Sequence, residues 1–297
     1  MLKKIISIVI AILIINCITC STIANNKLLS VEEIKNNLLC LGIPKQLIDT
    51  FDDEELFKYK NLQESDVTKK IFKIVTPQNI LAKESTPQEV FITEVSHAEY
   101  LNSTKKNQTR GLIDESYLEI TFTHATIDHG HYKITAFYHW LSTPTGGRTH
   151  YLAITLNESL NVIPNTVTAN QGSTKVNLIN GNEEFYMIPA SVCAEGIGGK
   201  AVEIYTWADS NTTMYYNYIG YLTYEAEVSE DPFDGTLVCA AFYTYAQAKL
   251  AITIIPTITI SQVLSDIGLT LTPGFTISPA TYFDFMNGQQ SWDYYNY

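Results

Sequence analysis

Hydrophobic residues recur along this chain with two different periods, and the change between them divides it into two parts. Between residues 27 and 60 the apolar positions, among them Val31, Ile34 and Leu38, follow the spacing of one helix face. From Tyr117 onward apolar and polar residues alternate, which is the period of a half-buried strand. The pattern predicts a small N-terminal helical element followed by a large β domain.

The helical element has its own start and stop signals. Ser30 and Glu33 have the spacing of a capping box, in which each side chain satisfies a backbone N–H of the first turn. Gly42 is expected to end this helix, and Asp52 is placed to cap a later one. These signals predict short helices within residues 25–62.

The β domain is predicted over residues 116–297, and residues 63–115 are interpreted as a linker with short strands. Turn sequences such as Asp128-His129-Gly130 separate many short alternating segments. Their number and spacing predict a mainly β fold, an antiparallel β-sandwich of jelly-roll or immunoglobulin-like topology. Two strand faces are expected to point inward: Leu118, Ile120, Phe122 and His124, and then Tyr132, Ile134, Ala136, Tyr138 and Trp140.

The first 24 residues have the features of a cleavable signal peptide. Lys3 and Lys4 precede an apolar run over residues 5–15, which is shorter than the roughly 20 residues of a membrane-spanning helix. The small side chains of Thr22 and Ala24 suit cleavage after Ala24. We therefore expect a secreted protein, or one at the extracellular face of the cell envelope. If the segment is kept instead, it is the one predicted contact with a membrane.

The charge balance is acidic and excludes several partners. The chain has 19 Lys and Arg against 31 Asp and Glu, a net charge of −12. Removing residues 1–24 takes away two lysines and no acid, so the net charge becomes −12 − 2, or about −14. Nucleic acids require a basic surface, and so do anionic lipids. Neither is a predicted partner.

Three cysteines remain after the predicted cleavage. Cys40 lies among leucines of the helical element and is interpreted as a small core residue. Cys193 and Cys239 both lie in alternating segments, and export would permit a disulfide between them. Free buried thiols are the alternative, which the odd number of cysteines favours.

Two short segments have a recognisable pattern. One runs from Leu41 to Leu56 and opens Leu-Gly-Ile-Pro; the other runs from Tyr132 to Leu156 and contains Trp140, Pro144 and Arg148. Both resemble segments of uncharacterised exported β-rich proteins of low-GC Gram-positive bacteria. The resemblance implies secretion and a β domain, and it implies no activity and no catalytic residue.

A group of potential metal ligands surrounds one predicted hairpin: His124, Asp128, His129 and His131. Imidazole and carboxylate groups bind zinc or copper, and pairing of the two flanking segments would bring His124 near His131. The residues therefore form either a divalent metal site or exposed histidines beside an ordinary turn. A secreted metal-dependent hydrolase that uses this cluster is the alternative functional hypothesis.

Aromatic residues are the most unusual feature of the composition, with 19 Tyr, 12 Phe and 3 Trp. Tyr205 and Trp207 are expected on one strand face, and Tyr216 and Tyr218 on another. Exposed rows of rings stack on sugars, whereas buried rows serve core packing. We interpret these four residues as candidate ligand-binding residues for a glycan or cell-wall ligand.

Recognisable catalytic and cofactor motifs are missing from the sequence. It has no Gly-x-Ser-x-Gly elbow, and the glycines around Gly198 lack the Lys-Ser/Thr of a phosphate-binding loop. No cofactor is predicted apart from the metal of the alternative hypothesis. The favoured function is an exported, non-catalytic protein that binds a ligand such as a carbohydrate at the cell surface. A third hypothesis is a membrane-active hairpin within Leu237–Ile260, a segment rich in apolar residues.

Overall fold

The computed structural model describes residues 29–77, 91–106, 113–144, 148–157, 159–196, 198–229, 235–246 and 283–294. The predicted signal peptide lies outside these residues. So does the part of the apolar segment Leu237–Ile260 that follows Ala246.

Strands dominate the described chain. The helices are α2 (Val31–Cys40), α3 (Lys45–Ile48), α4 (Asp53–Phe57) and α5 (His97–Lys106), with a short 3-10 turn at Glu64–Asp66. The strands are β1 (Val67–Pro77), β2 (Phe91–Val95), β3 (Ile113–Asp128), β4 (His131–Trp140), β5 (Arg148–Leu156), β6 (Leu160–Val162), β7 (Thr168–Asn177), β8 (Glu183–Pro189), β9 (Ser191–Gly196), β10 (Gly199–Thr206), β11 (Thr213–Val228), β12 (Gly235–Ala246) and β13 (Phe283–Tyr294).

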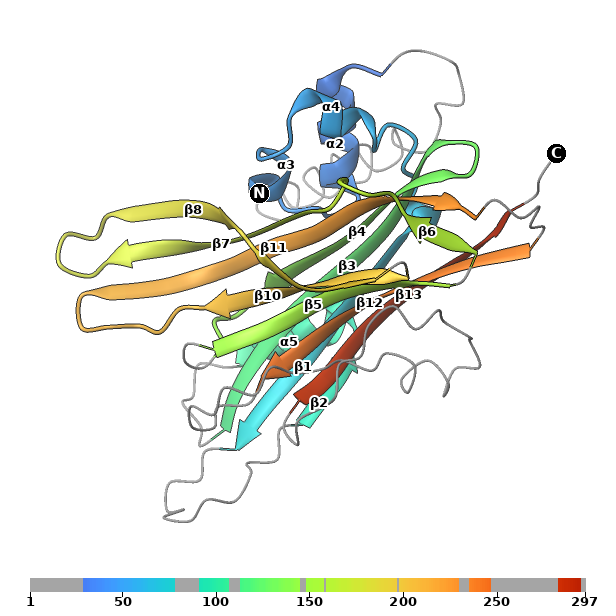
Figure 1. Ribbon diagram of the computed structural model, residues 1–297. Helices are drawn as coiled ribbons and strands as arrows, with labels where there is room; N and C mark the ends of the chain where they lie inside the picture. The colour runs from blue at the N-terminus through green and yellow to red at the C-terminus, as the bar shows by residue number, and fades with distance from the viewer. Residues whose placement is uncertain are drawn as a thin grey trace, which may run out of the picture.

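The strands form two antiparallel sheets that face each other (Figure 1). The large sheet has the order β2-β1-β3-β4-β11-β7-β8, with β6 paired to β11. The small sheet has the order β13-β12-β5-β10-β9. The predicted fold class, a mainly β antiparallel sandwich with a small helical element, is confirmed.

Side chains of both sheets fill the space between them. Leu118, Ile120 and Phe122 of β3 point inward, as alternation predicted, and meet residues of the small sheet such as Leu152 and Val202. The predicted inward face of β4 is also confirmed, because all five of its residues belong to the same core. Alternation predicts these inward faces correctly because β3 and β4 each pair with a neighbouring strand on both sides.

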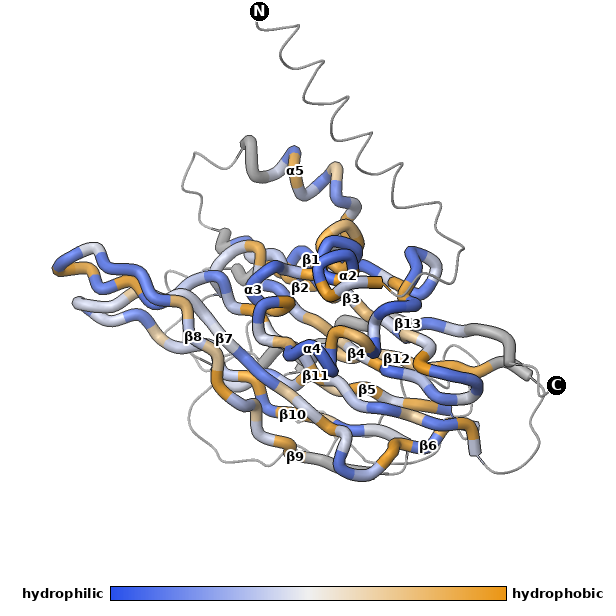
Figure 2. Tube along the Cα trace, turned by 90° about the horizontal axis from the view of Figure 1, so that it is seen from above, coloured by the Kyte–Doolittle hydropathy of each residue, from blue (hydrophilic) through white to orange (hydrophobic). Residues whose placement is uncertain are grey.

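Helices α2, α3 and α4 form a helical unit that packs on the outer face of the large sheet. Figure 2, seen from above, places this unit over β3, β4 and β11. Its predicted caps are confirmed: the Ser30–Glu33 capping box closes, and the Asp52 side chain accepts from the N–H of Glu55 at 2.8 Å. Gly42 has φ +85, the left-handed conformation that ends a helix at little cost for glycine. The fold therefore has three layers, and the large sheet is the middle one.

Apolar packing holds the helical unit to the sheet. Phe51 stacks on Tyr59 and meets Tyr221 edge-on with ring centroids 5.2 Å apart. The buried residues of this second core are Ile34, Leu38, Ile43, Leu47, Ile48, Phe51, Leu56, Tyr59 and Leu62 from the N-terminal part and Ala125, Phe137, Ile219 and Tyr221 from the sheet.

The segment interpreted as a linker with short strands contains β1, a strand of 11 residues in the large sheet. β1 pairs with β2 on one side and β3 on the other, and its Phe72 and Ile74 are buried between the sheets. Its outward positions hold lysines, and two of these form ion pairs with β3, Lys69 with Glu119 at 3.0 Å and Lys73 with Glu115 at 2.8 Å.

The cysteines do not form the bridge that export would permit. Cys239 faces the core between the sheets, whereas Cys193 is exposed on the edge strand β9. No disulfide joins them, so both are free thiols, and Cys239 alone is buried as that alternative predicted. Cys40 is exposed at the end of α2, which corrects its interpretation as a core residue.

Candidate ligand-binding site

Four aromatic rings meet where β10 ends, and we call them the aromatic platform: Tyr186, Trp207, Tyr215 and Tyr218. The Trp207 ring centroid lies 5.3 Å from that of Tyr186. It lies 6.0 Å from the ring centroids of both Tyr215 and Tyr218, and it is nearly parallel to the second, at 12°. Tyr218 is buried, whereas the other three rings are partly exposed. The platform therefore presents aromatic surface to solvent on a buried support.

The large sheet extends past the small one at this point. Strands β7 and β8 and the first part of β11 continue beyond the end of β10 (Figure 1). Two hydrogen bonds fix the rings at this edge. The Tyr218 hydroxyl donates to the carbonyl of Trp207 at 2.7 Å, and the N–H of Tyr215 donates to Asp209 Oδ1 at 2.8 Å. The rings are thus held in place before any ligand arrives.

A buried hydroxyl lies beside the platform. Ser173 on β7 is directly opposite Tyr186 on β8 and has no exposed surface. Its Oγ makes no hydrogen bond of normal geometry with the residues that the structure describes. Burial raises the pKa of Tyr186, an effect partly offset by the nearby Ser173, so the Tyr186 phenol keeps its proton at neutral pH. Because Ser173 has no exposed surface, its hydroxyl lies beneath the Tyr186 ring and does not face solvent.

A β-bulge in β11 aims Tyr218 into the platform. Tyr216 pairs with Thr174, but the next pair is Ile219 with Gly172, so the regular register is interrupted. Asn217 in the bulge has φ +53, which asparagine tolerates better than most residues. Tyr216 consequently lies on the outer face, where its hydroxyl donates to Glu183 at 2.9 Å, and Tyr218 faces inward. The expectation that Tyr216 and Tyr218 share a face is wrong, because alternation stops at a bulge.

Tyr205 is also separate from the platform. It is 37% exposed on the outer face of the small sheet, where its hydroxyl donates to Glu203. Because β10 ends at Thr206, Trp207 no longer follows the alternation that would place it beside Tyr205. Of the four ring residues predicted from the sequence, the structure brings together only Trp207 and Tyr218.

Sequence reasoning missed a polar row that supports the bulge. His139 Nε2 lies 3.1 Å from Asn217 Oδ1, and the Asn217 amide donates to Thr174 Oγ1 at 3.5 Å. Asparagine is depleted in strands, so its occurrence within Tyr-Tyr-Asn-Tyr was the signal for an irregularity. These contacts hold Asn217 in its left-handed conformation and so position Tyr218.

The histidines predicted as metal ligands do not converge. In the β3–β4 hairpin His124 pairs with Ile134, and Asp128 pairs with His131. His124 is buried between the sheets, where its Nδ1–H donates to Gln290 Oε1, whereas His131 lies on the outer face with its Nε2 2.9 Å from Glu225. His129 is exposed at the turn. Among the described residues, no group of three or more His, Cys, Asp or Glu side chains is arranged to hold a metal ion.

Two histidines, the buried His124 and the partly buried His139, predict a loss of stability in mild acid. Burial lowers the pKa of His124 and of His139 below the ordinary value of 6.5. The unfolded chain therefore binds protons first as the pH falls, so the stabilisation is complete above the unfolded pKa and is lost as the pH falls through the folded values. We expect the free energy of unfolding in urea to decrease between about pH 7 and pH 5.

The variant His124→Gln should reduce this pH dependence, because it removes one of the two titrating groups. His129→Gln removes an exposed imidazole from the same hairpin and should leave the slope unchanged. Equal slopes for wild type and His124→Gln would contradict the assignment.

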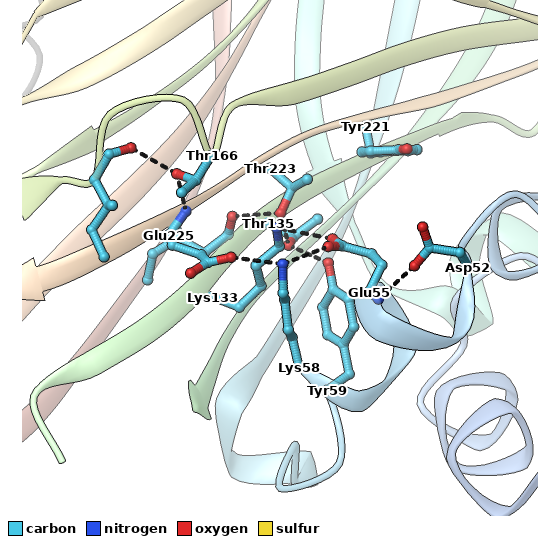
Figure 3. Close-up of polar contacts among 12 residues, drawn as sticks. Asp52, Glu55, Lys58, Tyr59, Lys133, Thr135, Thr166, Tyr221, Thr223 and Glu225 are labelled. Atoms are coloured by element: carbon cyan, nitrogen blue, oxygen red, sulfur yellow. Dashed lines mark hydrogen bonds and ion pairs between the residues drawn. The ribbon is translucent and has the colours of Figure 1, made fainter. Parts of the chain in front are cut away.

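A charged network connects the helical unit to the large sheet (Figure 3). The ammonium of Lys133, 1% exposed, lies 2.9 Å from Glu55 Oε1 of α4. Lys58 extends from the end of α4 to Glu225 of β11, at 2.8 Å. Burial lowers the pKa of Lys133 against the opposing effect of Glu55. Although burial acts to raise it, the pKa of Glu225 lies below its usual range because Lys58 contacts it directly.

A chain of hydroxyls lies next to these charges. The Tyr59 hydroxyl is 2.7 Å from Thr135 Oγ1, which is 2.7 Å from Thr223 Oγ1. Burial raises the pKa of Tyr59 far above its ordinary value, so the phenol stays neutral. Lys58 also pairs with Glu55 inside the helical unit at 3.5 Å, and the other contacts named here join that unit to a strand or join two strands. The network therefore connects the helical unit to the large sheet.

Comparison with known proteins gives no family. No family model and no curated protein matches this chain. One similar solved structure is the collagen-binding subdomain of the Enterococcus faecalis surface protein ACE, with 11% identity, 55% of this chain and 88% of that chain covered, and a TM-score of 0.25. The collagen adhesin of S. aureus is similar at 8% identity, with 76% and 80% covered and a TM-score of 0.23.

A third similar structure is AvmM, which catalyzes macrocyclization in alchivemycin A biosynthesis, at 10% identity, 57% and 82% coverage and a TM-score of 0.23. Such low TM-scores support no argument about function. The resemblance to exported Gram-positive proteins stays a prediction. Within the described residues, the helices are all too short or too polar to cross a bilayer.

Proposed function

We propose that this protein is an exported, non-catalytic binding protein whose aromatic platform takes a glycan. One observation supports this proposal: three partly exposed rings lie together against the buried ring of Tyr218. They belong to Tyr186, Trp207 and Tyr215. Extracellular action rests on the predicted signal peptide, so a cell-wall or surface polysaccharide is the expected class of ligand.

The chemistry of a sugar ring matches this surface. One face of a pyranose carries C–H groups, and aromatic rings bury that kind of surface well. The hydroxyls around the sugar edge need hydrogen-bond partners, and the partly exposed Tyr186 phenol can supply one. Fixed rings also lose little conformational freedom on binding, which favours affinity.

The test compares Trp207→Ala with Tyr205→Ala. Residues 25–297 of each variant are incubated with isolated cell wall and a set of insoluble polysaccharides, and the bound fraction is measured against protein concentration. Trp207 contacts the three other rings, so its loss should weaken binding by about 2 kcal/mol, or roughly thirtyfold.

Tyr205→Ala is the matched control, because it removes an exposed ring from the other sheet. It should bind like the wild type. Saturable binding that survives Trp207→Ala, or no retention of the wild type on any matrix, would refute the proposal.

A further inference from the structure

One carboxylate is fixed at the border of the aromatic platform. Asp209 is exposed in the connection between β10 and β11, and its Oδ1 accepts the N–H of Tyr215. Its negative charge is close enough to contribute, after burial, to the raised pKa of Tyr218. Within the part of the chain that the structure describes, no lysine or arginine forms an ion pair with Asp209. An accessible negative charge therefore lies beside the rings without a cation to neutralise it.

The combination of ring faces with a fixed carboxylate favours one charge type. A cation is attracted to the face of an aromatic ring, most strongly to tryptophan, and also to the carboxylate. The acidic surface of the whole chain, with a net charge of −12, attracts cationic ligands and repels anionic ones. A neutral sugar could donate a hydroxyl to Asp209, but it would leave the charge of the carboxylate uncompensated. A sulfated or phosphorylated sugar would face repulsion from it.

From this arrangement we infer that the ligand is an amino-sugar polymer with protonated amines, which stacks its sugar rings on Trp207 and directs an ammonium to Asp209. This inference rests on the proposed glycan-binding function and names the ligand class of the same site. It also assigns the two parts of the site different roles. The rings provide affinity for a sugar, and Asp209 provides the selection for positive charge.

The experiment measures the binding of matched oligomers of glucosamine and N-acetylglucosamine by calorimetry, at a pH at which the free amine is protonated. The two oligomers share the sugar ring and differ at the 2-amino group, which is an ammonium in one and an acetamide in the other. The part of the affinity ratio that is lost in Asp209→Asn therefore measures the contribution of the ammonium. The wild type should bind the glucosamine oligomer about tenfold more tightly. Asp209→Asn should remove this preference and keep the binding of the acetylated oligomer, because an asparagine oxygen still accepts from Tyr215.

Asp53→Asn is the matched control for charge. It removes one exposed carboxylate from the helical unit, on the other side of the large sheet, and should keep the preference. Equal binding of the two oligomers by the wild type, or a preference that survives Asp209→Asn, would overturn the inference. The inference would also be overturned if polylysine bound equally tightly and Trp207→Ala left that affinity unchanged, because this would show attraction by charge alone.

The outcomes separate this inference from the function on which it rests. If both oligomers bind equally and both depend on Trp207, glycan binding stands and the amino-sugar assignment fails. If neither oligomer nor any polysaccharide depends on Trp207, both fail.

Discussion

Replacing Glu55 by alanine is expected to lower the free energy of unfolding by about 3 kcal/mol. Glu55 is the nearest anion to Lys133, whose side chain is 1% exposed beneath the helical unit. Removing the carboxylate leaves a buried ammonium with weaker compensation, and the cost of an unpaired buried charge is large. We expect a value at the low end of the losses measured when buried ion pairs are broken, because Glu55 is itself 19% exposed and water can enter beside it. Unfolding in urea, followed by circular dichroism, measures the change.

Two further variants separate the buried pair from general effects on the helix. Glu54→Ala changes the exposed neighbour in α4 and should alter stability by less than about 0.5 kcal/mol. Glu55→Leu combined with Lys133→Met replaces both charges by apolar groups and should recover most of the loss. If Glu55→Ala is as stable as Glu54→Ala, the ion pair does not hold the helical unit on the sheet.

Replacing Trp140 by alanine is expected to cost about 3–5 kcal/mol of stability. Trp140 ends β4 and is 2% exposed between the two sheets. Its indole N–H donates to the Tyr243 hydroxyl at 3.1 Å, and its ring lies 5.8 Å from that of His150. Both partners belong to the small sheet, so one side chain joins the two halves of the sandwich. Its loss leaves a cavity and an unpaired hydroxyl together.

Trp140→Phe tests the same site without removing all of the packing. It should cost less than the alanine variant, because the phenyl ring fills most of the space and only the hydrogen bond is lost. Trp207→Ala is the comparison for a partly exposed tryptophan and should cost about 1 kcal/mol. Similar losses for Trp140→Ala and Trp207→Ala in urea unfolding would contradict the different burial of the two residues.

The local features of the fold follow directly from the sequence. Ser30, Glu33 and Asp52 act within a single helical turn, so their pattern was sufficient to predict the caps that form. The inward faces of β3 and β4 were equally predictable, because alternation depends only on the strand's own geometry. For β1 the sequence predicted only a short strand within a linker, because its pairing with β2 and β3 depends on segments that lie elsewhere in the chain.

The candidate site depended on contacts that the sequence does not display. The aromatic platform exists because the bulge at Asn217 turns Tyr218 inward, and His139 and Thr174, from other strands, hold that bulge. Tyr186 and Ser173 escaped notice because neither carries a motif. The predicted metal ligands His124 and His131 are near each other in the sequence. They nevertheless lie on different faces of the large sheet, so their side chains do not meet.

The sequence alone therefore determined the class of fold, the helical element with its caps and the strand faces of the central hairpin. Tertiary structure decided the strand order, the docking of the helical unit and the residues that meet at the site. The physical reason is the separation in sequence between the residues that interact. Caps and alternation are properties of neighbouring residues, whereas β4 pairs with β11, and Trp207 meets Tyr186, through contacts between distant segments that only the packed chain brings together.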